Sequence, residues 1–285
     1  MGEYQMKNRK RRDDREGRTK KRRRQRKFLK IGLLISVLLI AHCGMNAISG
    51  LRHGNVGDIK HWFAEEQQES VWNKQDSLRW LDGNYPDSLR KLAQNNPETI
   101  DFVKQYPEKK DRQDKIDVSG DLTGDIPLFL QWDERWGYRK YGGDYMAVNG
   151  CGPTCLSMVC CGLTGKSKWN PYQVARQAEQ DGYYVKGTGT SWDLMTNGAS
   201  GLGLQVERLP LDKTKIVNRL NKNHPIICTV GPGDFTTQGH FIVLTAVDKS
   251  GKIKLNDPNS LKRSEKKWEL DRLMSQIRNL WAYSL

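Results

Sequence analysis

The sequence lacks the motifs that indicate a zinc site or a phosphate-binding loop. It has no C-x-x-C pair and no H-E-x-x-H helix, which are spacings that let four donors converge on zinc. Gly162–Ser167 (GLTGKS) is similar to a phosphate loop, but that motif needs a glycine five residues before Gly165, where Cys160 stands. We therefore expect no metal and no other cofactor.

Acidic residues are scarce in the first thirty residues, and the positive charge of the chain is concentrated there. The net charge of the whole chain is +14. Residues 1–30 hold fifteen Lys or Arg and four Asp or Glu, a balance of +11, which leaves only +3 for the other 255 residues. A block such as Lys20–Lys27 cannot pack against itself. The excess positive charge therefore lies in an N-terminal tail, so nucleic acid is not an expected partner.

An apolar segment follows this tail. Phe28–Ile48 has an uncharged, mostly apolar core at Ile31–Ala41, and its length is about the ~20 residues needed to cross a bilayer. The positive-inside rule places residues 1–27 in the cytoplasm, against the anionic inner leaflet of the membrane, and everything after about residue 50 outside. We predict a single-pass transmembrane signal-anchor. The alternatives are a signal peptide cut after Ala47–Ser49 and a nucleic-acid-binding or nuclear-targeting arm.

Residues 49–124 are polar and charged, and we expect an extracytoplasmic stalk there. Pro86 and Pro97 each begin a short predicted helix. The apolar residues of the two helices are Leu89 and Leu92 in the first and Ile100, Phe102 and Val103 in the second. Two interpretations remain open, a helical pair that docks on the following domain and a flexible spacer. Lys109–Gly124 is predicted to be a linker.

We predict a compact domain at residues 125–285, where charge runs stop and Trp, Tyr, Gly and Cys become frequent. Asn170 and Pro171 predict a helix N-terminus, and Gly251 a hairpin turn. Helices are expected at 153–161, 171–180, after 191, at 214–221 and near 269–277, and strands at 127–130, 226–230, 241–247, 252–256 and 280–283. Helices come first and antiparallel strands later, which indicates an α+β fold.

Four cysteines fall within the fourteen residues Asn149–Gly162 (NGCGPTCLSMVCCG). Cys155, Cys160 and Cys161 have apolar neighbours, and adjacent residues point about 100° apart on a helix. We interpret these three, and Cys228 in PIICTV, as buried small hydrophobes. Disulfides outside the cytoplasm are the alternative.

Cys151 differs, because it lies between Gly150 and Gly152 just before a helix that is predicted to begin at Pro153. The free N–H groups and aligned dipoles at that end favour a thiolate, which is the nucleophilic form. Acyl transfer would also need a base and an oxyanion hole.

His240 is the candidate base, since of the five histidines it is the one that opens a strand after a glycine-bearing loop. Folding the hairpin returns Asp257 to within a rung or two of His240, close enough to bond its Nδ1–H and set the tautomer. Gln131, twenty residues before Cys151, could donate its amide to an oxyanion. Alone, such a histidine is more often structural, and Asp257 before proline is an ordinary strand-ending turn.

This set of residues resembles the peptidase C-thirty-nine-like family, papain-like cysteine peptidases related to those that remove double-glycine leaders from bacteriocins. The resemblance covers about Ile126–Leu285 and is carried by the segments IPLFLQWDERWGYRKYGG, NGCGPTCLSMV, GTSWDLM, GHFIVLTAVD and KIKLNDPN. It implies a papain-like α+β domain with the cysteine helix packed on an antiparallel sheet. It also implies that Cys151 is the nucleophile, His240 the general base and then acid, Asp257 the orienting carboxylate and Gln131 the oxyanion donor.

The expected function is hydrolysis of a peptide amide bond outside the cell through an acyl-enzyme. Gly150 stands where leader-cleaving members of transporters usually have an acidic residue, so the peptide or protein substrate need not be a leader. We expect a stand-alone membrane-tethered relative in which Gly152, Trp192 and Gly239 contact substrate.

Two alternatives are weighed against the peptidase. One is a non-catalytic module that holds peptides or glycans in a cleft lined by Trp192 and Tyr183 or Tyr184. The other is a cell-wall cysteine amidase or a transglutaminase-like acyl transferase. The 89 residues between Cys151 and His240 argue against the transglutaminase version.

Overall fold

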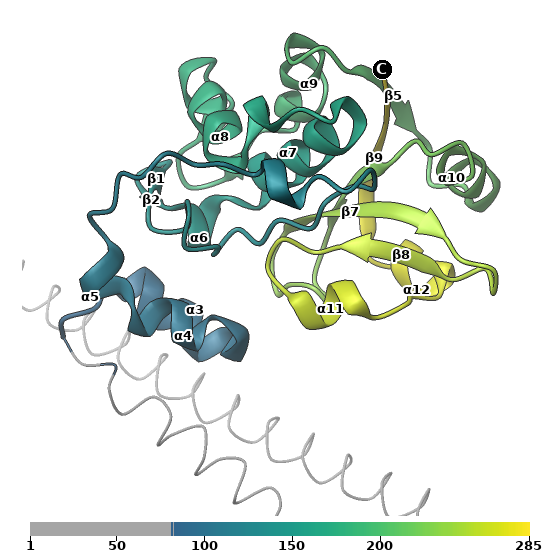
Figure 1. The fold of residues 1–285 in the computed structure, drawn as a ribbon. Coiled ribbons are helices and arrows are strands. Elements are labelled where there is room, and N and C mark those ends of the chain that lie inside the picture. Colours follow the sequence, from purple (N-terminus) through teal and green to yellow (C-terminus); the bar gives the residue numbers. More distant parts are fainter. Residues whose placement is uncertain (1–80, 82) are drawn as a thin grey trace, which may run out of the picture. The chain divides into compact units, whose positions relative to one another are not determined.

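An antiparallel sheet of five strands lies at the centre of the structure, which is a computed structural model that describes residue 81 and residues 83–285 (Figure 1). The strands are β5 (Gln205–Leu209), β6 (Ile226–Val230), β7 (His240–Val247), β8 (Ile253–Asn256) and β9 (Ile277–Ser284). Their order in the sheet is β5-β9-β6-β7-β8, and each neighbouring pair is antiparallel. The strand predicted at 226–230 matches β6 at both ends.

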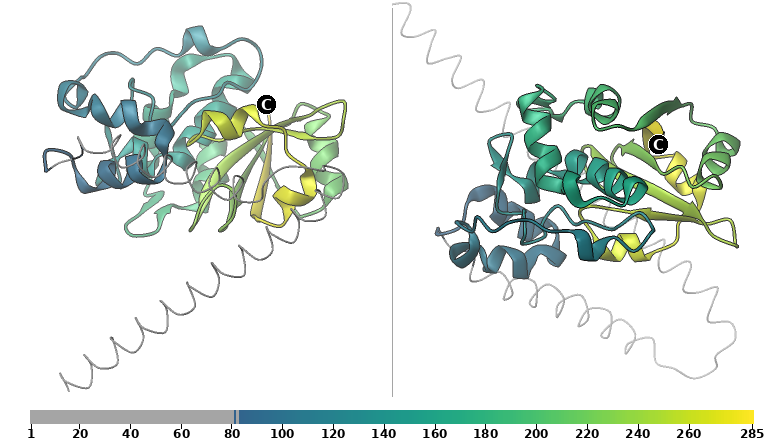
Figure 2. Two further views of the ribbon diagram at one scale, coloured as in Figure 1. Left: turned by 90° about the horizontal axis from the view of Figure 1, so that it is seen from below. Right: turned by 45° about the horizontal axis from the view of Figure 1, so that its top comes forward.

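Helices cover both faces of this sheet (Figures 1 and 2). Helix α7 (Cys151–Thr164) packs on the face that presents Ile227 and Val243, and α8 (Pro171–Gln180) packs on α7. The opposite face, with Ile226, Cys228 and Leu244, packs against α10 (Lys213–Leu220) and α12 (Leu270–Met274). Both faces are apolar because neighbouring strand residues point to opposite sides and both sides are covered.

Helix α7 is the buried helix of the domain. Ten of its fourteen residues are buried, because it lies between the sheet and α8. It ends at Thr164, and Gly165 caps it in the left-handed conformation (φ 65°). Its first residue is Cys151, so the helix begins two residues before the predicted start at Pro153.

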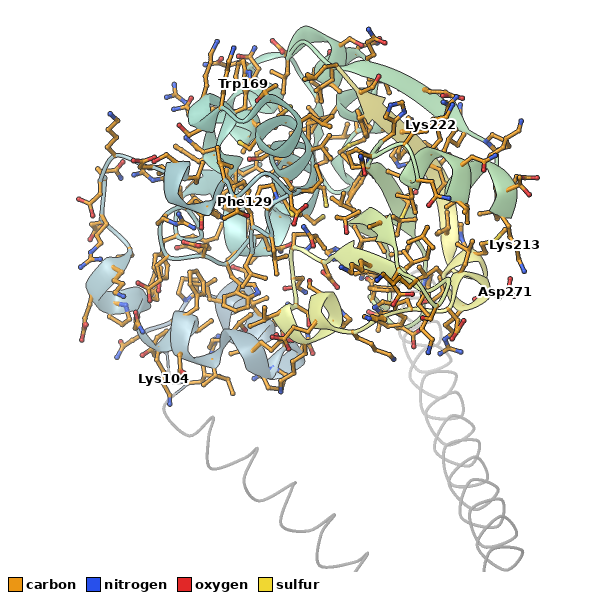
Figure 3. The ribbon with its side chains drawn as sticks, turned by 45° about the vertical axis from the view of Figure 1, so that its right-hand side comes forward. Lys104, Phe129, Trp169, Lys213, Lys222 and Asp271 are labelled. Atoms are coloured by element: carbon orange, nitrogen blue, oxygen red, sulfur yellow. The ribbon has the colours of Figure 1, made fainter. Side chains whose placement is uncertain are left out.

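Local signals set the ends of several other elements. Asn170 caps α8 by accepting a hydrogen bond from the backbone N–H of Gln173, as predicted. Gly251 has a φ of 83° in the turn between β7 and β8. On the far face, Lys213 at the start of α10 pairs with Asp271 in α12 (Figure 3).

The strand predicted at 127–130 is wrong. This segment is extended and buries Phe129 against the α7 side of the core (Figure 3), but it joins no sheet. Its polar contacts come instead from the Asn256 side chain, which donates to the carbonyls of Ile126 and Pro127 at 3.1 and 3.0 Å.

The remaining elements of this part of the chain are short. They are the hairpins β1 (Lys140–Tyr141) with β2 (Asp144–Tyr145) and β3 (Tyr184–Val185) with β4 (Gly189–Thr190), the helices α6 (Met146–Asn149), α9 (Asn197–Gly201) and α11 (Leu261–Glu265), and the 3-10 turns η3 (Ser119–Asp121), η4 (Ser167–Trp169) and η5 (Trp192–Met195).

The two helices expected in the stalk pack on the domain and belong to the same compact unit. They comprise α3 (Asp87–Asn95), the 3-10 turn η2 (Pro97–Thr99), α4 (Ile100–Lys104) and α5 (Tyr106–Lys109). Leu89, Phe102 and Val103 are buried in a cluster with residues of the β1–α6 region. The Phe102 ring stacks on Tyr138 with centroids 4.2 Å apart, and the Tyr138 hydroxyl donates to the Phe102 carbonyl at 2.6 Å. The helical pair therefore docks on the domain and is not a flexible spacer.

Within residue 81 and residues 83–285, no helix combines the length and apolar character that a bilayer crossing requires. The predicted tail, the signal-anchor at 28–48 and the first part of the stalk lie outside the described residues.

Candidate active site

The β7–β8 hairpin brings His240 and Asp257 together. His240 is the first residue of β7, and Asp257 directly follows β8, which pairs with β7 through Val243 and Asn256. The His240 Nε2 atom lies 2.8 Å from Asp257 Oδ1, and the two residues are 8% and 0% exposed. The pairing is as predicted, but the predicted nitrogen is wrong, because Nε2 and not Nδ1 bonds the carboxylate. Nδ1 is thus the ring nitrogen left for a reacting group.

The Asp257 carboxylate is held on both oxygens. Arg263 Nε donates to Oδ2 at 2.5 Å, and the backbone N–H of Asn259 donates to Oδ1 at 2.8 Å. Burial raises the pKa of Asp257, but the charges and hydrogen bonds of His240 and Arg263 outweigh burial and hold it below its usual range. The group is therefore an anion at neutral pH.

This anion controls the protonation of His240. Burial lowers the pKa of the ring, but the Asp257 carboxylate and a hydrogen bond with Cys151 outweigh that effect and raise the pKa to about 10. The ring is thus a buried imidazolium at neutral pH, with Asp257 on one nitrogen and the Cys151 side chain as its other polar neighbour.

Cys151 reaches His240 because α7 packs directly on β7. It is partly exposed, unlike Cys155, Cys160, Cys161 and Cys228, which are buried as predicted. Gly152 lets the start of the helix approach β4, since a Cβ there would lie 2.8 Å from the Thr190 side chain. Thr190 in turn bonds the buried Tyr141 hydroxyl at 2.9 Å. A helix start leaves its first backbone N–H groups without helical acceptors, and Cys151 stands at that point.

Gln131 lies under the turn that leads into Cys151. It is 3% exposed, and its Nε2 donates to the carbonyl of Ala147 at 2.7 Å, with Val148 more distant at 3.4 Å. An amide nitrogen has two hydrogens, and the long contact with the Val148 carbonyl is the one that a substrate oxygen could replace. Its Oε1 is buried and has no hydrogen-bond partner among the described residues.

A sequence model of the Peptidase_C39 like family matches residues 123–284. The chain belongs to this family. The resemblance drawn from the sequence is thereby confirmed, together with a papain-like α+β domain built on an antiparallel sheet. A search of the curated proteins finds no match. Among solved structures, the chain is similar to the crystal structure of the peptidase domain of Streptococcus ComA, a bi-functional ABC transporter involved in the quorum sensing pathway. That likeness has 20% identity and a TM-score of 0.37, and it covers 48% of this chain and 91% of that chain.

Three further residues of this family domain were expected to contact substrate. Gly239 is exposed directly before His240. Trp192, in η5, is 53% exposed, and its ring centroid lies 6.4 Å from that of Trp281. Gly152 is buried against Thr190, so it packs the helix start and does not form open surface. Tyr184 packs edge-on against Tyr141, with ring centroids 5.2 Å apart.

A groove of about 830 Å³ opens beside Gln131. One wall is the helical pair, through α3 and Asn96, and the other is the loop Gly233–Thr237 with Asn259 and Arg263. The loop is anchored by Asp234, which accepts two hydrogen bonds from Arg272 at 2.7 and 2.8 Å. The sequence did not predict either wall of the groove. The wall residues are mostly common polar surface residues, and they come together only in the folded chain.

Proposed function

We propose that the domain is a cysteine peptidase that hydrolyses a peptide amide bond through an acyl-enzyme, with Cys151 as nucleophile. The observation that carries the proposal is the buried His240–Asp257 pair, whose imidazole also meets the one partly exposed cysteine of the described residues, at the start of α7. Membership of the Peptidase_C39 like family supports a cysteine peptidase. The groove of about 830 Å³ beside Gln131 is the proposed place for part of the substrate peptide.

Acylation follows from these positions. The thiol proton already lies on His240 Nδ1 in the charged ring, so the Cys151 sulfur attacks the scissile carbonyl carbon directly. A C–S bond forms as the carbonyl oxygen becomes an oxyanion. The backbone N–H of Cys151 and the second amide hydrogen of Gln131 are the proposed donors to that oxygen. The imidazolium then gives its proton to the departing amine as the C–N bond breaks, which leaves a thioester. A ring whose pKa is about 10 stays charged until that transfer.

Deacylation repeats the steps with water. His240 removes a proton from a water molecule that attacks the thioester carbonyl, and the C–S bond breaks to release a carboxylic acid. The proton taken from water stays on His240 Nδ1, which restores the charged ring beside the Cys151 sulfur. Asp257 stays ionised throughout and orients the ring.

An iodoacetamide probe at neutral pH tests the nucleophile. Wild-type protein should be labelled at Cys151, as located by peptide mass mapping, and Cys151→Ala should lose that label. Cys228→Ala is the matched control, because Cys228 is 0% exposed and its loss should leave labelling unchanged. Equal labelling of Cys151→Ala and wild type would refute the proposal and favour a binding module. Product from purified peptidoglycan, and none from a glycine-glycine peptide library, would indicate an amidase.

We also propose that the peptidase domain faces outward from a single-pass anchor at Phe28–Ile48. The apolar segment with its basic flank supports this placement.

A further inference from the structure

We propose that Glu98, in the helical pair, is a positioning residue that holds the Asp257 carboxylate against His240. Glu98 lies in η2, outside the residues that match the family. The proposal rests on the proposed function, because it assigns Asp257 a role in catalysis. It makes the helical pair part of the catalytic apparatus and not only a docked neighbour.

The first step is the contact between Glu98 and the turn after Asp257. One Glu98 carboxylate oxygen accepts a hydrogen bond from the Ser260 hydroxyl, and the other accepts the backbone N–H of Lys262 at 3.1 Å. Asn96, two residues earlier, donates its Nδ2 to the Asn259 carbonyl at 2.7 Å. The helical pair therefore holds the Asn259–Lys262 segment at three of its residues.

The second step leads from this segment to both oxygens of Asp257. The N–H of Asn259 bonds Asp257 Oδ1, the atom that faces His240. The Ser260 hydroxyl oxygen accepts the N–H of Arg263 at 3.0 Å, and Arg263 Nε bonds Asp257 Oδ2. Asp257 Oδ1 is thus held by Asn259 of this segment, and Oδ2 is held by Arg263, whose backbone N–H bonds Ser260 of the segment.

The third step is that the contacts that dock the helical pair differ from those that Glu98 makes with the turn. The helical pair has its own contacts with the domain, namely the buried Leu89, Phe102 and Val103 and the bond from Tyr138 to the Phe102 carbonyl. Glu98 contributes no apolar area to that cluster. Asn96 Oδ1 accepts the N–H of Glu98 at 3.1 Å, which fixes the residue that reaches across to Ser260. Loss of the Glu98 carboxylate should therefore release the turn while the helices remain docked.

The test measures the His240 titration by NMR on full-length protein carrying ¹³C at histidine Cε1. The charged and titratable groups that face this ring are Asp257 and Cys151, with Arg263 behind Asp257. Glu98→Ala should lower the pKa of His240 by at least about one unit, which is a tenfold loss of proton affinity. The reason is that the Asp257 carboxylate would no longer be held in place against His240 Nε2. Glu98→Gln keeps one acceptor oxygen and should recover part of that shift.

Tyr138→Phe is the matched control, since it removes another single hydrogen bond between the helical pair and the domain but touches no part of the turn. It should lower stability and leave the His240 titration unchanged. An unchanged titration in the Glu98 variants, or an equal shift in Tyr138→Phe, would overturn the proposal. If Glu98→Ala fails to fold, Glu98→Gln alone decides in the same way. The measurement needs no substrate, so its outcome is separate from that of the Cys151 labelling.

Discussion

Asp257→Asn is the sharpest perturbation of the site, because it removes one charge and keeps the shape of the side chain. The amide oxygen that the substitution introduces can still accept from His240 Nε2–H, but the amide NH₂ would face the Arg263 Nε donor. Without the carboxylate, only Cys151 opposes the effect of burial, so the pKa of His240 should fall from about 10 toward its ordinary 6.5. A shift of about three units corresponds to about 4 kcal/mol of lost interaction with the charged ring.

The sign of the pH dependence follows from the two shifts. His240 has a raised pKa, so its contribution to stability is complete below 6.5 and is lost as the pH rises through about 10. Asp257 has a lowered pKa, so its contribution is present above 3.8 and is lost as the pH falls through the lowered value. The stability gap between wild type and Asp257→Asn should therefore be largest between pH 3.8 and 6.5 and shrink toward pH 10.

Urea unfolding at several pH values, together with the His240 titration, checks both statements. Asp271→Asn is the control, because it removes the same charge from an exposed pair with Lys213 and should change stability by at most about 1 kcal/mol. The reasoning is refuted if His240 in Asp257→Asn titrates within about one unit of wild type, or if the stability gap is the same at about pH 5.5 and about pH 10.

Two further predictions concern the helix start and the anchor. Gly152→Ala places a Cβ 2.8 Å from Thr190 and should cost about 1–3 kcal/mol of unfolding free energy while slowing Cys151 alkylation. Gly201→Ala, where a Cβ meets nothing within 4 Å, is its control, and equal urea midpoints for the two variants would contradict the packing argument. For the anchor, protease added to intact cells should digest residues 49–285 and spare an N-terminal tag, and deletion of 28–48 should release the chain from membranes. Protection of the peptidase domain would exclude an outward orientation.

Local sequence signals predicted those parts of the molecule that depend on near neighbours. Asn170 with Pro171 located the start of α8, and Gly251 located the turn that returns Asp257 to His240. Both are short-range effects of capping and of backbone conformation. The pairing of His240 with Asp257 followed from the hairpin alone.

Features that depend on distant partners could not be predicted in this way. Pro127–Leu130 has a strand-like composition, yet the carbonyls of Ile126 and Pro127 bond the side chain of Asn256 and not a neighbouring strand. Directly after the segment, the N–H of Gln131 bonds the carbonyl of Pro258. Strand β5 (QVERL) is polar and was missed, because it becomes a strand only by pairing with β9. Which nitrogen of His240 meets Asp257 is set by the rotation of the ring, which no spacing encodes. The role of Glu98 depends on contacts across 162 and 164 residues.

The position of β9 between β5 and β6 has a consequence for the nascent chain. The β6–β7–β8 ribbon, with the imidazole and carboxylate already adjacent, can form as soon as it leaves the ribosome. Strand β5 is made earlier but must wait for Ile277–Ser284 before it has a hydrogen-bonding neighbour. The same late segment carries Tyr283, whose hydroxyl bonds the carbonyl of Met195 on the α7 side at 2.9 Å. The His240–Asp257 pairing can thus form early, whereas the support under the cysteine helix is completed only when β9 has been made.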